Sequence, residues 1–234
     1  TLTATSTGSP TVSASTTLTT SAVTVDTLLV DQDLDAPDTR TYYTDALTAA
    51  GVQFGVYDIK SGPQLPIGLL QAYTNVVWYT GNTYPGPILR YEPELTAFLN
   101  GGGRLFLNGQ DLLDQVAGTS DFVHDYLHID WDGTEAQNDK ATANVTGVAG
   151  DAVTDGIGTI TINHSVLTAA FEDRITPIGP AVGAFTDDGG NFDALDVSTD
   201  GYKVVFLAFP FEAYGSASDK SDLMTRVFAF FAAP

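Results

Sequence analysis

Carboxylate and amide side chains stand where several predicted strands end. They are Asp31, Gln32, Asp33, Asn82, Gln110, Asp111 and Glu212. The carboxyl ends of parallel strands meet at one edge of a sheet, where open α/β proteins bind their ligands. We therefore expect these side chains to line one crevice, where they could bind a cation or a polar ligand such as a sugar, or act as a general acid and base. The alternative, which we favour on the sequence alone, is that they cap helices and hydrogen-bond loops.

Four of the acids in the segment 31–38 have oxygen-donor spacing that resembles part of a calcium loop. They are Asp31, Asp33, Asp35 and Asp38. An EF-hand loop also needs a central Gly and a distal Glu, and both are missing. The negative charge of this segment therefore favours calcium binding, but its sequence does not match a calcium-binding motif. A second acidic segment, 186–201, contains five Asp residues and is read as solvated β-turns.

Two of the three histidines, His124 and His128, are four residues apart in a predicted helix over 120–131. Such a pair can hold zinc, but the full H-E-x-x-H motif is absent because Asp125 follows the first histidine. We favour a surface or packing role for both. His164 stands apart from them. Asn144 and Asn163 begin N-glycosylation triplets, which also arise often by chance.

The elements that must position these residues begin at Val25. Apolar runs predict strands over 25–33, 52–59, 75–82, 104–110 and 202–211, and amphipathic spacing predicts helices over 37–51, 92–103, 111–116, 120–131 and 218–234, the last capped by Ser218. A short helix or turn is expected within 65–73. This alternation predicts an α/β fold with a mostly parallel, doubly wound sheet and helices on both faces. Residues 132–200 read as a β-rich insertion before the last strand and helix.

Composition limits the partners and the chemistry. The 234 residues carry a net charge of −20, which argues against nucleic acid or an anionic membrane as a partner. The chain has no cysteine, so disulfides, thiolate metal sites and a cysteine nucleophile are excluded. No apolar run is long enough to predict a membrane-spanning helix.

Residues 1–24 are rich in Thr, Ser and Ala and carry no charge. This segment is expected to be a linker or the remnant of a preceding β-sandwich, or alternatively a strand-forming arm that pairs with a neighbouring subunit. Residues 25–234 are expected to form one domain. Because the chain opens without a start Met or a signal peptide, we expect it to be part of a longer precursor.

Several stretches together resemble a known superfamily. "LLVDQD", "YYTDALTAAGVQFGVYDI", "AFLNGGGRLFLNGQDL" and "YKVVFLAFPFEAY" are similar to the class I glutamine-amidotransferase-like superfamily. They more closely resemble its divergent branch, found as an accessory domain in secreted bacterial and archaeal multidomain proteins, often beside peptidase modules. The resemblance covers roughly 25–130 and 200–232 and implies a flavodoxin-like α/β fold.

The departures from that superfamily concern its catalytic residues. Active members carry a cysteine in a G-x-C-x-G elbow, with His and Glu from an H-P-E-like motif. Here the elbow reads "LNGQDLL", which places Gln110 or Asp111 at the nucleophile position. The second motif reads "FPFE", which keeps Pro210 and Glu212 but has no histidine. The resemblance therefore implies a scaffold without cysteine–histidine chemistry.

Three functions are open at this point. The leading hypothesis is a non-catalytic accessory or interaction domain of a secreted or cell-surface protein from a bacterium or archaeon, with other domains of the same precursor or neighbouring subunits as partners. The second is a structural component of an extracellular assembly, joined through the N-terminal arm. The third is a carboxylate-based hydrolase that uses Asp111 and Glu212.

Overall fold

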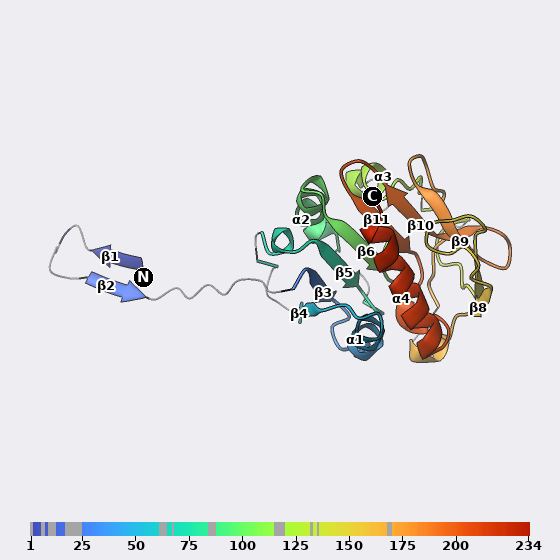
Figure 1. Ribbon diagram of the computed structural model, residues 1–234, viewed down its shortest axis with the longest axis horizontal. Helices are drawn as coiled ribbons and strands as arrows, with labels where there is room; N and C mark the ends of the chain where they lie inside the picture. Colours follow the sequence, from blue (N-terminus) through green and yellow to red (C-terminus); the bar gives the residue numbers. More distant parts are fainter. Residues whose placement is uncertain are drawn as a thin grey trace.

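The computed structural model describes residues 2–5, 8, 13–16, 25–60, 65–66, 68–83, 88–114, 120–131, 133–134, 136–167 and 170–234. Its main feature is a nine-stranded sheet in the order β4-β3-β5-β6-β11-β10-β9-β7-β8 (Figure 1). The strands are β3 (Thr27–Asp31), β4 (Phe54–Asp58), β5 (Asn75–Tyr79), β6 (Arg104–Asn108), β7 (Asn144–Gly147), β8 (Thr159–Thr161), β9 (Val182–Thr186), β10 (Phe192–Ser198) and β11 (Lys203–Leu207). The helices are α1 (Arg40–Ala49), α2 (Ile88–Asn100), α3 (Asp121–Asp125) and α4 (Ala217–Ala232), with 3-10 turns η1 (Leu70–Ala72), η3 (His164–Val166) and η4 (Phe211–Ala213).

The sheet is mixed. Strands β4, β3, β5, β6 and β11 pair in parallel, whereas β10, β9, β7 and β8 continue the sheet in antiparallel pairs. The α/β class is therefore correct, and the parallel part is the part predicted from residues 25–110 and 202–211. The β-rich segment 132–200 contributes β7 to β10, which extend this same sheet beyond β11.

Alternating side chains of the parallel strands build a core on each face of the sheet. In β5, Val77 and Tyr79 belong to one core, whereas Val76 and Trp78 belong to the other. Helices α1 and α4 supply residues such as Leu47 to the first core, and α2 and α3 supply residues of the second. Strands β3, β5 and β11 are buried along their whole length, and the central residues of each are apolar.

The closing helix α4 begins earlier than predicted. Its N-cap is Ser216 and not Ser218. The Ser216 side chain accepts a hydrogen bond from the Asp219 amide, and the Asp219 carboxylate accepts one in return from the Ser216 amide. This capping box satisfies two amide groups at the start of the helix.

The interpretation of 186–201 as solvated turns is wrong for residues 192–198. Residues Phe192–Ser198 form β10, between β9 and β11. Two of its five aspartates, Asp193 and Asp196, are buried in this strand. Asp187 does organise a turn, since its carboxylate accepts hydrogen bonds from the amides of Gly189 and Asn191.

Two predicted helices are shorter than expected. Asp111–Asp114 form turns in place of the first turn of a helix over 111–116; residues 115–119 lie outside the described residues. Helix α3 ends at Asp125, and His128 adopts a φ of 54° that no α-helix contains. Irregular chain after α3 still buries Leu127, because tertiary packing and not helical periodicity places its side chain in the core.

The N-terminal segment contains two short strands, β1 (Leu2–Thr5) and β2 (Ser13–Thr16), which pair antiparallel in a sheet of their own. Figure 1 draws this hairpin apart from the α/β body. Its role as linker, sandwich remnant or arm stays a prediction. Among the residues that the structure describes, no helix is both long and apolar enough to cross a membrane.

Candidate functional site

The turn after β6 has the backbone of a nucleophile elbow. Gly109 follows the strand with a φ of 157°, and Asp111 adopts a φ of 56°, which a residue with a side chain rarely takes. A Cβ atom at Gly109 would lie only 1.9 Å from Thr80 Oγ1, so glycine is required there. A sharp, strained turn of this kind presents a nucleophile at the end of a strand in α/β hydrolases. Asp111 occupies the strained position here.

A main-chain segment from the β-rich region covers the elbow. The Phe171 carbonyl accepts a hydrogen bond of 3.0 Å from the Asp111 amide, and the Phe171 amide donates one of 3.4 Å to Gln110 Oε1. The Gln110 amide group also donates to Asn82 Oδ1. Gln110 and Asp111 are consequently only 3% and 7% exposed. Three of the predicted crevice residues, Asn82, Gln110 and Asp111, are thus brought together.

Other carboxylates surround Asp111. Burial raises the pKa of Asp111 to about 7, and the neighbouring charges of Asp139 and Asp114 act in the same direction. Burial likewise raises the pKa of Asp173 to about 8, with a contribution from Asp111. A hydrogen bond to the side chain of Asp139 raises the pKa of Asp111 as well. No sequence pattern predicts this pairing, because Asp139 lies far along the chain in an irregular segment.

Among the described residues, Glu212 does not join this cluster through any hydrogen bond. The Tyr43 hydroxyl lies 2.6 Å from Asn108 Oδ1 and 2.5 Å from Glu212 Oε2. Asn108 Oδ1 is fixed as an acceptor, since it also receives the Phe211 amide, and Tyr43 has a single hydroxyl proton. The single hydroxyl proton of Tyr43 can be donated to only one of these two acceptors at a time, so protonation of Glu212 would let its carboxylic acid donate to the Tyr43 oxygen and complete both hydrogen bonds.

Burial favours the neutral form of Glu212. Its side chain is 1% exposed, and burial raises its pKa to about 7. A buried carboxylic acid with a hydrogen-bond acceptor is stable in its neutral form. Sequence reasoning missed Tyr43 and Asn108, because both are distant from Glu212 in the chain and no local pattern links them.

Asp31 and Asp33 act as organisers of the loop that leads into α1. Asp31 Oδ2 accepts a hydrogen bond of 2.5 Å from Arg40, and Asp33 Oδ2 accepts from the Thr39 amide and hydroxyl. Carboxylate oxygens of Asp31, Asp33 and Asp38 lie within 4.8 Å of one another, whereas Asp35 forms an ion pair with Lys60. Gln32 is fully buried and accepts from the Trp78 indole. Asp33 thus hydrogen-bonds the loop before α1, whereas Asp31 forms an ion pair with Arg40.

We expect calcium to leave the thermal unfolding midpoint unchanged. The Arg40 guanidinium already neutralises Asp31 and Asp58, and a Ca²⁺ ion would have to displace it. Differential scanning calorimetry in calcium and in chelator measures this directly. The Arg40→Ala variant is the matched control, because removing the guanidinium frees the Asp31 carboxylate. A calcium-dependent rise in the wild-type midpoint would contradict the expectation.

The histidines do not form a shared site. His124 is exposed and contacts Asp125, whereas His128 contacts the Tyr202 hydroxyl at 2.9 Å beyond the end of α3. The predicted i, i+4 geometry therefore does not exist. His164, to which the sequence assigned no role, contacts the fully buried Glu172 at 2.8 Å.

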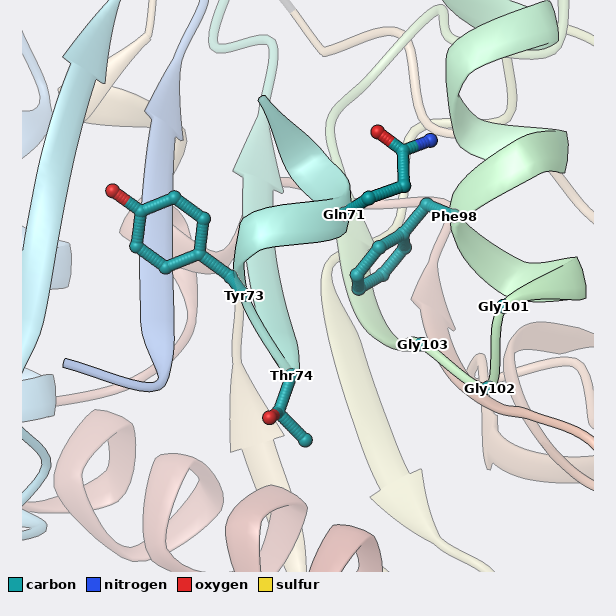
Figure 2. Close-up of a pocket in the computed structure, with 7 residues that line it drawn as sticks. All are labelled: Gln71, Tyr73, Thr74, Phe98, Gly101, Gly102 and Gly103. Atoms are coloured by element: carbon teal, nitrogen blue, oxygen red, sulfur yellow. The ribbon is translucent and has the colours of Figure 1, made fainter. Parts of the chain in front are cut away.

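A cavity of about 170 Å³ lies at the amino ends of β5 and β6. It is lined by Gln71, Tyr73, Thr74, Phe98, Gly101, Gly102 and Gly103. Figure 2 shows the Phe98 ring beside the glycines that end α2. A Cβ at Gly103 would lie 2.5 Å from that ring, so the glycine serves packing. This cavity is at the opposite end of the strands from the predicted crevice, and its lining contains no carboxylate or histidine.

No protein-family model and no curated protein matches the sequence. Several solved structures match the fold. An exo-beta-1,4-mannosidase, Op5Man5 from Opitutaceae bacterium strain TAV5, matches with 17% identity and a TM-score of 0.52 over 88% of this chain and 35% of the mannosidase chain, so this chain spans about a third of that enzyme. A putative GMP synthase subunit from Thermoplasma acidophilum matches with 10% identity and a TM-score of 0.58 over 89% and 94% of the two chains. The mmIFT52 N-terminal domain matches with 12% identity and a TM-score of 0.54 over 89% and 98%.

These likenesses concern the fold alone, because each identity is below one fifth. The match to the GMP synthase structure agrees, at the level of the fold, with the amidotransferase-like resemblance of the sequence. The chain thus has an α/β fold that is shared by enzymes and by at least one domain whose description names no activity.

Proposed function

We propose that this chain is a non-catalytic accessory or interaction domain of a secreted or cell-surface protein, built on a degenerate, doubly wound amidotransferase-like scaffold. The observation that carries the proposal is the elbow covered by Phe171. The residue at the nucleophile position, Asp111, is 7% exposed, and its amide is bonded to the covering segment. A substrate would have to displace this segment before it could reach the elbow.

The chemistry of the neighbouring groups also supports this proposal. Nucleophilic catalysis needs an attacking atom and a base that takes its proton. Asp111 is hydrogen-bonded to Asp139, and Glu212 is hydrogen-bonded to Tyr43. The two acids proposed for a hydrolase therefore contact different partners and do not face one common substrate position. An accessory role needs only the stable scaffold that these contacts provide. Its partners would be other domains of the same precursor or neighbouring subunits.

The test is an assay of the purified chain against glutamine, chromogenic glycosides and a peptide library. We expect no turnover that depends on Asp111. The Asp111→Asn variant is compared with Asp114→Asn, which changes a nearby carboxylate outside the strained turn. Turnover by the wild type that Asp111→Asn abolishes and Asp114→Asn retains would overturn the proposal.

A further inference from the structure

We propose that Asp151 and Asp196 form a proton-binding pair that fastens the turn over residues 148–157 to the sheet. Asp196 lies in the middle of β10, opposite Val205 of β11 and Val182 of β9. Asp151 opens the turn that follows β7. The two side chains come from separate parts of the fold and contact each other, although they are only 6% and 4% exposed.

The two oxygens of Asp151 have different roles. Oδ1 accepts hydrogen bonds from the Val153 amide at 3.0 Å and the Thr154 amide at 2.8 Å, and the Thr154 hydroxyl oxygen lies 2.9 Å from it. These bonds hold the turn in shape. Oδ2 has no donor, and neither has Oδ2 of Asp196, among the groups that the structure describes.

A proton supplies the missing donor. Ionised carboxylates only accept hydrogen bonds, so two of them in buried contact repel each other. When one is protonated, its hydroxyl donates to the other, and a single charge is shared between two carboxyl groups. Burial, followed by the hydrogen bond and the charge of Asp151, raises the pKa of Asp196 to about 8.

The nearby cations do not replace the proton. Lys203 of β11 lowers the pKa of Asp196, but its ammonium donates to the carbonyls of Phe230 and Ala233 at 2.8 and 2.7 Å. Arg226 of α4 binds the Asp155 carbonyl at 2.9 Å and the Asp222 carboxylate. Strand β9, with the sequence VGAFT, contributes no titratable side chain.

A proton also fits this pair better than a metal ion. Among the described residues, three side chains lie close enough together to hold a metal ion, namely Asp31, Asp33 and Asp38. That group does not include Asp151 or Asp196. Asp151 and Asp196 offer two oxygens to a common point, whereas Ca²⁺ takes roughly six to eight. The pair is therefore suited to bind a proton.

Loss of the proton should release the turn. The turn buries Val153, which is 1% exposed, and the Thr154 hydroxyl donates to the Ala184 carbonyl at 2.5 Å. Two ionised carboxylates in this position would separate to regain water, and the turn would open with Asp151. Opening of a local segment appears as faster amide hydrogen exchange.

Hydrogen exchange of the wild-type chain at pH 6 and pH 9 tests the proposal. After correction for the intrinsic pH dependence of exchange, the protection of the Val153 and Thr154 amides should fall by about tenfold, since the proton-bound population changes about tenfold for each pH step beyond the pKa. The amides of β5 should keep their protection. Equal protection of the turn at both pH values would overturn the proposal.

The Asp196→Asn variant tests whether loss of a proton causes the loss of amide protection at pH 9. Its amide can donate to Asp151 at every pH, so the turn should stay protected at pH 9. Asp193→Asn, which changes the other buried aspartate of β10, should leave the pH dependence of the turn unchanged. The proposal would be refuted if added calcium restored the protection of the wild-type turn at pH 9 and Asp196→Asn did not. That result would show that the pair binds a metal ion and not a proton.

Discussion

The free energy of unfolding should increase when the pH is lowered from 9 to 5. Burial disfavours the charged form of several buried carboxyl groups, raising the pKa of Asp31 and raising those of five others to about 7 or 8. The pKa values of Asp111 and Glu212 are raised to about 7, and those of Asp173, Asp193 and Asp196 to about 8. Each of these groups binds its proton more tightly in the folded chain than in the unfolded chain.

The sign of the effect follows from this difference. A carboxyl group with a raised pKa stabilises the fold fully below its unfolded pKa, near 4, and loses that contribution as the pH rises through its folded pKa, here about 7 to 8. Each unit by which the folded pKa exceeds the unfolded one is worth about 1.4 kcal/mol, so the five raised pKa values together contribute at least several kcal/mol. That is a large part of the stability of an ordinary domain, roughly 5 to 15 kcal/mol.

Other carboxylates set the acid limit. Asp187 is partly desolvated, but hydrogen bonds from Asn191 and the charge of Arg174 outweigh this and lower its pKa. The hydrogen bond from Ser216 lowers the pKa of Asp219. Both contributions are lost as the pH falls through these lowered values, below about 4. Stability should therefore be greatest between about pH 4 and 6.

Urea unfolding at intervals between pH 5 and pH 9 measures the predicted slope. Glu212→Gln should flatten the curve, because its amide donates to Tyr43 at every pH. Asp45→Asn, on the exposed side of α1, is the control and should leave the slope unchanged. A free energy of unfolding that is constant or rises toward pH 9 would show that these carboxyl groups are not protonated in the fold.

The same protonation explains what sequence patterns can and cannot predict. Strands β3, β5 and β11 are predictable because both of their faces are buried and their central residues are apolar. Strand β10 is not, because Asp193 and Asp196 are typical of turns when they are charged. A neutral aspartic acid can lie in a buried strand, but its protonation depends on neighbours that come from other parts of the chain.

The candidate site is predictable to a similar extent. Strand ends indicate the positions of Asp31, Asp111 and Glu212, since topology brings these ends to one edge. Their partners are not predictable, because Tyr43, Asn108 and Phe171 reach them across long stretches of sequence. The elbow can be recognised from "NGQD", yet only the structure shows Phe171 covering it.

Gly109→Ala should destabilise the fold by about 3 kcal/mol or more, the combined scale of overpacking and of a strained backbone. The added Cβ would lie 1.9 Å from Thr80 Oγ1 and 3.2 Å from Thr80 Cβ, and Gly109 has a φ of 157°. Neither β5 nor β6 can move aside easily, because both are central strands with buried side chains. Urea unfolding at pH 5 measures the loss where the carboxyl groups are protonated.

Two further variants show whether the elbow itself is the cause. Gly158→Ala is the matched control and should have little effect, because a Cβ there meets no atom within 4 Å. Adding Thr80→Ala to Gly109→Ala removes the closest contact but keeps the Thr80 Cβ position, so it should recover part of the lost stability and not all of it. Equal stability of Gly109→Ala and Gly158→Ala would mean that the chain after β6 does not form the tight turn on which the elbow depends. Destabilisation by Gly109→Ala with partial recovery in the double variant would instead place Thr80 directly behind the turn that presents Asp111.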